Sequence, residues 1–158
     1  MELAPLSRAE LRKSVIRPRA DNLFTQKKKK YTAAIAQLKI GGIPISAVID
    51  SGASSSLISR PCLVKTGYNI TGPSKAVIVT AGGQQIRPKG EVQNLPIQVQ
   101  NRKIPVTVDV MDVNNYSLIL GNDWLQQAGA ILDWGEHTLT IQQENKPIVT
   151  KVMLSERN

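Results

Sequence analysis

From Tyr31 onward the chain is a succession of short apolar segments rich in Val and Ile, separated by Gly, Pro and Asn residues. Such segments are too short for helices, and β-branched residues favour strands. Aromatic residues make up only 4% of the chain, so the core must consist mainly of Ile, Val, Leu and Ala. The pattern predicts an all-β closed barrel or sandwich with one helix. The expected strands are 31–40, 43–49, 76–80, 85–92, 95–99, 104–111, 118–120, 131–134, 138–142 and 148–154, and the expected helix is 122–128. Asn101 and Arg102 are the expected tip of a hairpin between 95–99 and 104–111.

The N-terminal 30 residues differ in composition from the rest. Residues 1–32 carry nine Lys and Arg against three Asp and Glu, which is +6 of the net charge of +8. A Ser-x-x-Glu capping box predicts a short helix over 8–16. We therefore expect a basic arm or linker (1–30), a folded domain (31–154) and a tail (155–158). The arm is either a solvated extension or a candidate nucleic-acid-binding segment.

The single cysteine, Cys62, and the single histidine, His137, limit the available chemistry. One cysteine excludes an intramolecular disulfide framework and a cysteine-built zinc site, and one histidine argues against a His-rich metal centre. We expect no metal and no cofactor. No apolar run approaches the roughly 18 residues of a membrane helix, and the N-terminus lacks the apolar segment of a signal peptide. We expect an intracellular, cytoplasmic protein without a membrane partner, with a nuclear location left open.

The candidate for chemistry is Asp50, which follows the apolar residues 47–49 and opens the turn Ser51-Gly52-Ala53. A short carboxylate after a strand is more often a turn residue that accepts hydrogen bonds from nearby backbone amides. Asp-Ser-Gly alone is therefore a weak indication of catalysis.

A second segment makes the first more specific. Some 70 residues further on, the apolar run 118–120 ends at Gly121, and the expected helix follows with Asn122 as its N-cap and Gly129 as its end. Taken alone, this is an ordinary strand-to-helix turn. A Gly-containing hairpin tip over 80–84 lies between the two segments. The three features in this order are much more specific than any one of them.

Together these motifs resemble those of the retropepsins, the aspartic proteases of retroviruses and retrotransposons. Asp50-Ser51-Gly52-Ala53 resembles the family's Asp-Thr/Ser-Gly-Ala signature, and Ile119-Leu120-Gly121 resembles its downstream apolar-apolar-Gly motif. The tract LILGNDWLQQAGAILDW is most similar to proteases of Ty3/gypsy-type retrotransposon Pol polyproteins. The resemblance covers 31–141 and extends at most to Leu154. It implies a retropepsin-like closed β-barrel or sandwich with a flap hairpin and one short helix after the second Gly motif.

The resemblance also implies an aspartic endopeptidase that cuts polypeptides such as Gag-Pol-like polyproteins. In such an enzyme a water is held between two carboxylates. The ionised one takes the proton of the water, and the protonated one donates to the scissile carbonyl. Carboxylates about 3 Å apart share one proton, and aspartic proteases are the standard example of this effect. Activity should therefore be highest at mildly acidic pH.

Only Asp50 has the required loop. Asp133 is followed by Trp instead of Ser or Thr, and Asp109, Asp112 and Asp123 lack the Gly turn. One catalytic aspartate per chain requires a second chain. The sequence therefore predicts a homodimer with two-fold symmetry, in which the two Asp50 side chains face each other across the axis.

The neighbouring residues acquire supporting roles. Ser51 can hydrogen-bond across the dimer axis, while Gly52 and Ala53 leave room for the substrate backbone. Gly121 lets the following helix pack closely behind the active loop. Five residues form the expected substrate-binding flap, in which paired glycines suit opening and closing over an extended peptide: Thr80, Ala81, Gly82, Gly83 and Gln84.

Two alternatives stay open. The domain could be a catalytically silent module for dimerisation or peptide binding, although the intact Asp50 motif argues against this. The basic arm could bind nucleic acid, but apart from Phe24 and Tyr31 this region lacks aromatic side chains on which bases could stack.

Overall fold

The computed structural model of the protein describes residues 30–80 and 82–157, with side chains for 33–80 and 82–155. The helix expected over 8–16 lies outside the described residues. Residues Tyr31–Ser155 form one compact unit. In chain order, the elements are β1 (Lys30–Ile40), β2 (Ile43–Ile49), β3 (Ser56–Ser59), α2 (Arg60–Thr66), β4 (Ile78–Val79), β5 (Gln85–Ile86), β6 (Gly90–Val99), β7 (Arg102–Met111), β8 (Leu118–Leu120), α3 (Asn122–Ala128), β9 (Ala130–Asp133), β10 (Thr138–Ile141), a 3₁₀ turn (Gln143–Asn145) and β11 (Ile148–Arg157).

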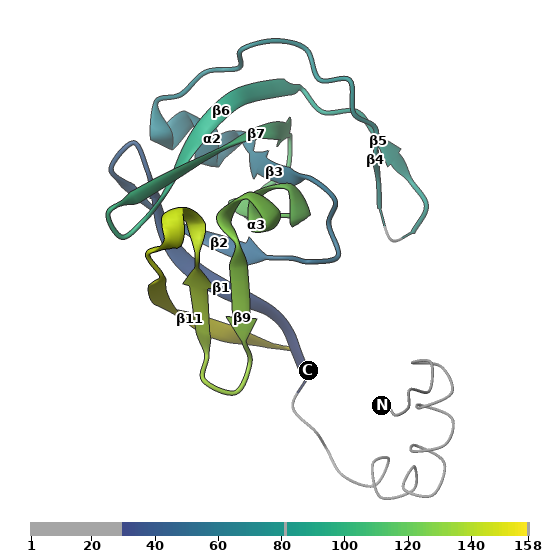
Figure 1. The fold of residues 1–158 in the computed structure, drawn as a ribbon. Coiled ribbons are helices and arrows are strands. Elements are labelled where there is room, and N and C mark those ends of the chain that lie inside the picture. The colour runs from purple at the N-terminus through teal and green to yellow at the C-terminus, as the bar shows by residue number, and fades with distance from the viewer. Residues whose placement is uncertain (1–29, 81, 158) are drawn as a thin grey trace, which may run out of the picture. The chain divides into compact units, whose positions relative to one another are not determined.

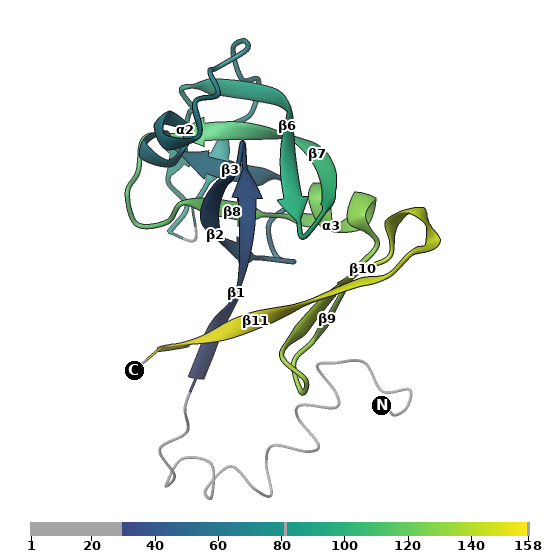
Figure 2. The same cartoon turned by 90° about the vertical axis from the view of Figure 1, so that its left-hand side faces the viewer.

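Six strands close into a barrel in the order β2-β8-β3-β7-β6-β1, because β1 pairs again with β2. Closure leaves these strands without a free edge. Beyond β1 the sheet continues through β11, β10 and β9, which lie below the barrel strands in Figure 2. β4 and β5 form a separate two-stranded hairpin that stands apart from the barrel in Figure 1. The expected closed-barrel β fold is confirmed.

The barrel core is aliphatic, as the composition requires. On β1 every second side chain from Ala34 to Ile40 is buried, which is the two-residue period of a strand with one face in the core. Trp124 on α3 is also fully buried, and its indole Nε1 donates a 3.1 Å hydrogen bond to the Ile104 carbonyl oxygen. This bond satisfies the polar atom of a buried aromatic side chain and fixes α3 against β7.

The hairpin expected between 95–99 and 104–111 is present as β6 and β7, but its turn lies at Gln100 and Asn101 instead of Asn101 and Arg102. Gln100 has a positive φ of 54°, as a tight hairpin turn requires. The strands expected over 76–80 and 85–92 are shorter than predicted. Only the two-residue strands β4 and β5 pair there, and β6 begins at Gly90.

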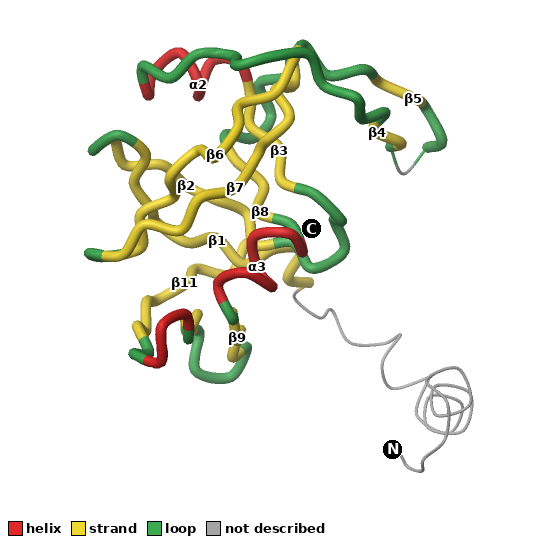
Figure 3. The backbone as a smooth tube through the Cα atoms, turned by 45° about the horizontal axis from the view of Figure 1, so that its top comes forward, coloured by secondary structure: helices red, strands yellow, loops and turns green. Residues whose placement is uncertain are grey.

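The helix expected over 122–128 is present as α3 and ends at Gly129 in the left-handed conformation. Its N-cap is Gly121, so the expectation that Asn122 caps it is wrong. The expectation of a single helix is also wrong, because α2 precedes β4 and lies well apart from α3 in Figure 3. The Ser59 Oγ caps α2 by accepting a hydrogen bond from the Cys62 amide, and Gly67 ends it. These are ordinary cap signals for a seven-residue helix.

Candidate active site

Parallel pairing of β2 and β8 brings the two sequence motifs together. Ile49 and Leu120 are register partners, so the loops that follow them leave the sheet side by side. The Asp50 amide donates to the Leu120 carbonyl oxygen (3.0 Å), and the Asn122 amide donates to the Ala53 carbonyl oxygen (2.8 Å). The loop 50–53 is thus held to the start of α3 by backbone hydrogen bonds from both sides.

The Asp50 carboxylate is exposed and oriented by its own turn. The Gly52 amide donates to Asp50 Oδ1 at 2.9 Å, and the Ala53 amide donates to the Asp50 carbonyl oxygen at 3.1 Å. The Ser51 carbonyl oxygen accepts a 2.7 Å hydrogen bond from Asn122 Nδ2. Asp50 is therefore a turn residue whose carboxylate accepts a hydrogen bond from a nearby backbone amide. This carboxylate also stays accessible to a second molecule.

Gly121 has a steric role where the loop 50–53 meets the start of α3. A Cβ atom there would lie 2.6 Å from the Ser55 carbonyl oxygen and 2.7 Å from that of Ala53. No side chain can occupy this position unless the backbone moves, which agrees with the close approach expected from the sequence.

A cavity of about 690 Å³ joins the Asp50 loop to the β4–β5 hairpin. Its lining is made by three groups of residues: the loop (Asp50, Gly52, Ala53, Ser54, Ser55), two barrel side chains (Leu57, Ile119) and the first arm of the hairpin (Val77, Ile78, Val79, Thr80). We refer to this cavity as the groove. It places an exposed carboxylate beside a walled space large enough for part of a peptide chain.

The residues expected to form the flap divide into two sets. Thr80 lines the groove, its amide donates to the Gln84 carbonyl oxygen (2.9 Å), and its Oγ1 accepts from the Gln84 amide (3.2 Å). Gly82, Gly83 and Gln84 are exposed and form the turn, where Gly83 has a φ of 85°. Ala81 lies outside the described residues.

Sequence reasoning missed a hydrogen-bonded network behind the loop. Ser56 is fully buried, and its Oγ accepts from the Gly121 amide (3.0 Å) and donates to Asp123 Oδ1 (2.7 Å). Asp123 Oδ2 accepts from the Ser56 amide (3.0 Å). Ser56 and Asp123 are 67 residues apart in sequence, so no local motif predicts their contact.

An apolar pocket of about 340 Å³ adjoins the loop at Ser51. Its other lining residues come from β2, α3 and the β9–β10 hairpin: Ile49, Asn122, Leu125, Gln126, Ala130, Leu132, Trp134 and Leu139. Trp134 is 51% exposed, and Ile131 on the same hairpin is equally exposed. An apolar surface next to the candidate site is thus open to solvent.

Across the described ranges 30–80 and 82–157, no three His, Cys, Asp or Glu side chains gather as metal ligands would. In the same ranges, no helix has both the length and the apolar character needed to cross a bilayer.

Comparison with protein families gives one family. The family model described as "Retroviral aspartyl protease" matches residues 14–147. The Arabidopsis thaliana protein DNA-DAMAGE INDUCIBLE 1 is 27% identical over 104 residues, which are 66% of this chain and 25% of that protein. The Schizosaccharomyces pombe UBA domain-containing protein Mud1 is 24% identical over 71% of this chain and 34% of its own length. The chain thus spans about a quarter to a third of these relatives.

Solved structures share the fold. The retroviral protease-like domain of Ddi1 from Leishmania major superposes with a TM-score of 0.62 and 21% identity, over 78% of this chain and 96% of that one. EIAV protease in complex with an inhibitor has a TM-score of 0.52 and 24% identity, over 66% of this chain and 93% of its own. The family model matches most of the chain, and the solved structures share its barrel fold: the chain belongs to the retroviral aspartyl protease family.

Proposed function

We propose that the protein is a homodimeric aspartic endopeptidase in which Asp50 and its symmetry mate activate water to hydrolyse peptide bonds. The observation that carries this proposal is the exposed Asp50 carboxylate. It is held by the Gly52 amide and faces the groove between the loop and the β4–β5 hairpin. Such a carboxylate is accessible to substrate and lies in a fixed orientation.

The chemistry needs two carboxylates with different protonation. One Asp50 accepts a proton from the water, whose oxygen adds to the scissile carbonyl, while the other donates its proton to the carbonyl oxygen. When the C–N bond breaks, the first Asp50 gives its proton to the leaving amine and the second takes one back from the tetrahedral intermediate. A lone Asp50 cannot fill both roles at once. The second copy therefore completes the site.

The surface around Ser51 is suited to contact with a second copy of the chain, which would supply the second Asp50. The apolar pocket there, which the exposed Trp134 side chain helps to line, adjoins the catalytic loop at Ser51. Burial of such a surface in a two-fold interface would bring two Asp50 loops together and remove apolar side chains from water. Ser51, at the rim of this pocket, is placed to hydrogen-bond with the partner loop.

The β4–β5 hairpin is proposed to act as the flap. Thr80 and the strand before it line the groove, and the Gly82-Gly83 turn provides a tip that can move. An extended substrate would pair with this hairpin as an added strand.

The proposal also covers the substrate and the origin of the protein. The similarity of the tract LILGNDWLQQAGAILDW to Ty3/gypsy-type proteases supports a retrotransposon Pol origin and a Gag-Pol-like polyprotein as substrate. The relatives named above are DNA damage-inducible proteins and a UBA domain protein, which makes other intracellular polypeptides the alternative substrates to test. The basic arm is proposed to bind nucleic acid, and a steep fall of affinity with salt would support this.

Peptide-library cleavage at about pH 5, read by mass spectrometry, tests the proposal. Wild-type protein should cleave, and Asp50→Asn, which keeps the shape but removes the acid–base group, should not. Equal cleavage by both proteins would mean that another site or a contaminant is responsible. No cleavage by a sample shown to be dimeric would favour the silent binding module.

A further inference from the structure

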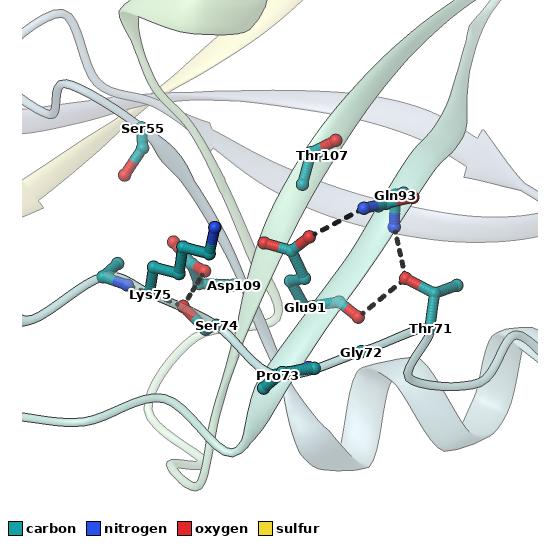
Figure 4. Close-up of a pocket in the computed structure, with 11 residues that line it drawn as sticks. Ser55, Thr71, Gly72, Pro73, Ser74, Lys75, Glu91, Gln93, Thr107 and Asp109 are labelled. Carbon is teal, nitrogen blue, oxygen red and sulfur yellow. Dashed lines mark hydrogen bonds between the residues drawn. The ribbon is translucent and has the colours of Figure 1, made fainter.

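A second cavity, of about 620 Å³, lies between barrel strands β6 and β7 and the segment 71–76 that leads to the hairpin. Most of its lining residues are polar, and all of them are drawn in Figure 4: Ser55, Thr71, Gly72, Pro73, Ser74, Lys75, Ala76, Glu91, Gln93, Thr107 and Asp109. We refer to this cavity as the side chamber. Its charged side chains are two carboxylates and one ammonium group, so its net charge is negative.

The two carboxylates are directly opposite each other in the sheet. Glu91 on β6 and Asp109 on β7 are antiparallel register partners, so their side chains project from the same face. Like charges at opposed positions destabilise a strand pair. A cation placed between them would remove this repulsion.

Asp109 is also incompletely satisfied. It is only 8% exposed, and Ser74 Oγ donates a 2.6 Å hydrogen bond to its Oδ1. Among the residues that the structure describes, no other hydrogen-bond donor reaches this carboxylate. Its second oxygen, Oδ2, is not sealed from solvent and is free to accept a hydrogen bond from a ligand. The small remaining exposure of Asp109 faces the side chamber, which it lines.

The other two charged groups leave room for an incoming cation. Glu91 Oε2 accepts a 3.1 Å hydrogen bond from Gln93 Nε2, and its carboxylate remains half-exposed at the chamber wall. Lys75 is exposed and forms no hydrogen bond with the other residues drawn in Figure 4. A mobile surface ammonium is a weak competitor for a buried carboxylate.

The side chamber lies next to the catalytic groove. Ser55 lines both cavities. Leu57, which lines the groove, is the register partner of Asp109 in the β3–β7 pair. A long substrate side chain that leaves the groove past Ser55 therefore points toward Asp109 and Glu91.

We propose that Asp109 and Glu91 make the side chamber a specificity subsite for a lysine or arginine side chain of the substrate. This inference rests on the proposed peptidase function, and it adds a substrate class to it. Lysine and arginine have the reach, and they bring a second positive charge and hydrogen-bond donors to two carboxylates that Lys75 alone does not neutralise. The donor set favours an organic cation over a metal ion, because the described residues supply no third His, Cys, Asp or Glu ligand. In a two-fold dimer each copy contributes one chamber, so the preference falls at matching positions on both sides of the cut.

The first test is library cleavage at about pH 6 by wild type, Asp109→Asn, Glu91→Gln and Lys75→Met. Both acid-to-amide changes keep an acceptor for Ser74 or Gln93. Wild type should prefer Lys or Arg over norleucine by about tenfold at two matching positions, one on each side of the cut, and each amide variant should lose most of that preference. Lys75→Met should increase it. Glu136→Gln, an exposed hairpin residue with the same charge change, should leave it unaltered. Circular dichroism of each variant checks that it is folded.

A second test separates failure of this inference from failure of the proposed function. Calorimetric titration uses Asp50→Asn, which cannot cleave, with alanine-rich decapeptides that carry one lysine or one norleucine at each position in turn. The lysine peptide should bind about tenfold more tightly than the norleucine peptide when the lysine stands at either of two matching positions, and Asp109→Asn in the same background should abolish the difference. Cleavage without any Lys or Arg preference would overturn the subsite and leave the peptidase standing. No cleavage together with a lysine preference in binding would overturn the peptidase and support the subsite. Equal binding, or no binding of either peptide, would overturn the subsite.

Discussion

Two aspartates that follow neighbouring strands differ in how far the protein hydrogen-bonds their carboxylates. Asp50 follows β2 and Asp123 lies near the start of α3, after β8, the parallel partner of β2. Asp123 accepts hydrogen bonds from the Ser56 amide, the Ser56 hydroxyl and the Trp124 amide, at 3.0, 2.7 and 2.7 Å. Asp50 accepts one from the Gly52 amide and is otherwise exposed at the groove.

The difference separates a structural carboxylate from a chemical one. The Asp123 carboxylate accepts hydrogen bonds from its own chain, so removal of this side chain should lower the free energy of unfolding. Asp50 gains little from its own chain, and its free oxygen can bind a water or a partner carboxylate. Asp109 lies between these cases, with one hydrogen bond in a buried position.

The largest effect is expected at Asp50. Asp50→Asn removes the acid and base of the dyad in one change and should lower kcat about 10⁴-fold, while the free energy of unfolding changes by about 0.5 kcal/mol or less. Peptide cleavage and urea unfolding measure the two quantities. A large loss of stability would contradict the comparison, because Asp50 would then be a structural residue as well.

Asp123→Ala should show the reverse. It leaves the buried Ser56 amide and hydroxyl without their acceptors, and the free energy of unfolding should fall by about 3 kcal/mol. Asp123→Asn keeps one acceptor and should lose only about 1 kcal/mol. At a temperature where each variant is folded, kcat should stay within about tenfold of wild type. A stable Asp123→Ala protein without activity would place Asp123 in the chemistry.

Gly121→Ala tests the contact that joins the two regions. The added Cβ would meet the Ser55 carbonyl oxygen at 2.6 Å, and the overpacking should cost about 2 kcal/mol of unfolding free energy. Gly72→Ala is the matched control, because its Cβ would meet nothing within 4 Å, and its change should stay within about 0.5 kcal/mol. Equal urea midpoints for the two variants would mean that the loop and α3 are not closely packed.

The smallest effect on stability is expected from Cys62, whose ionisable thiol lies in an apolar environment. Burial raises the pKa of the Cys62 thiol, and the nearby Lys65 charge offsets part of this rise. Because the unfolded thiol ionises near 9.0 and the folded one at higher pH, this contribution to stability is complete below pH 9.0 and is lost as the pH rises through the folded pKa. Urea midpoints of wild type should fall between pH 8 and 10 more steeply than those of Cys62→Ala. Parallel curves would show that the thiol is not buried in solution.

The sequence predicted the parts of the molecule that carry local signals. The hairpin of β6 and β7, the helix α3 with Gly129 at its end, and the order of the Asp50 and Gly121 motifs all follow from residues close together in the chain. α2 was missed because its seven residues, RPCLVKT, begin with Arg-Pro and are too few to show a helical period. Its cap residues, Ser59 and Gly67, were the available signal.

The missed parts of the site depend on contacts between distant segments. Ser56 meets Asp123 only because β3 pairs with β8 in the closed barrel, and Asp109 meets Glu91 only through the register of β6 and β7. Both aspartates lack the Gly turn that distinguishes Asp50 in the sequence. Their roles depend on strand register, which composition and periodicity do not determine.

Mixing wild type with Asp50→Asn tests the central claim most directly. The two proteins are unfolded together, refolded at a ninefold excess of the variant, and assayed by peptide cleavage per wild-type chain. If one active site needs Asp50 from two copies, random pairing leaves about one tenth of the activity of wild type refolded alone. The same excess of an unrelated protein should leave the activity unchanged. Undiminished activity per wild-type chain in the mixture would show that one copy suffices, and would contradict the two-copy site.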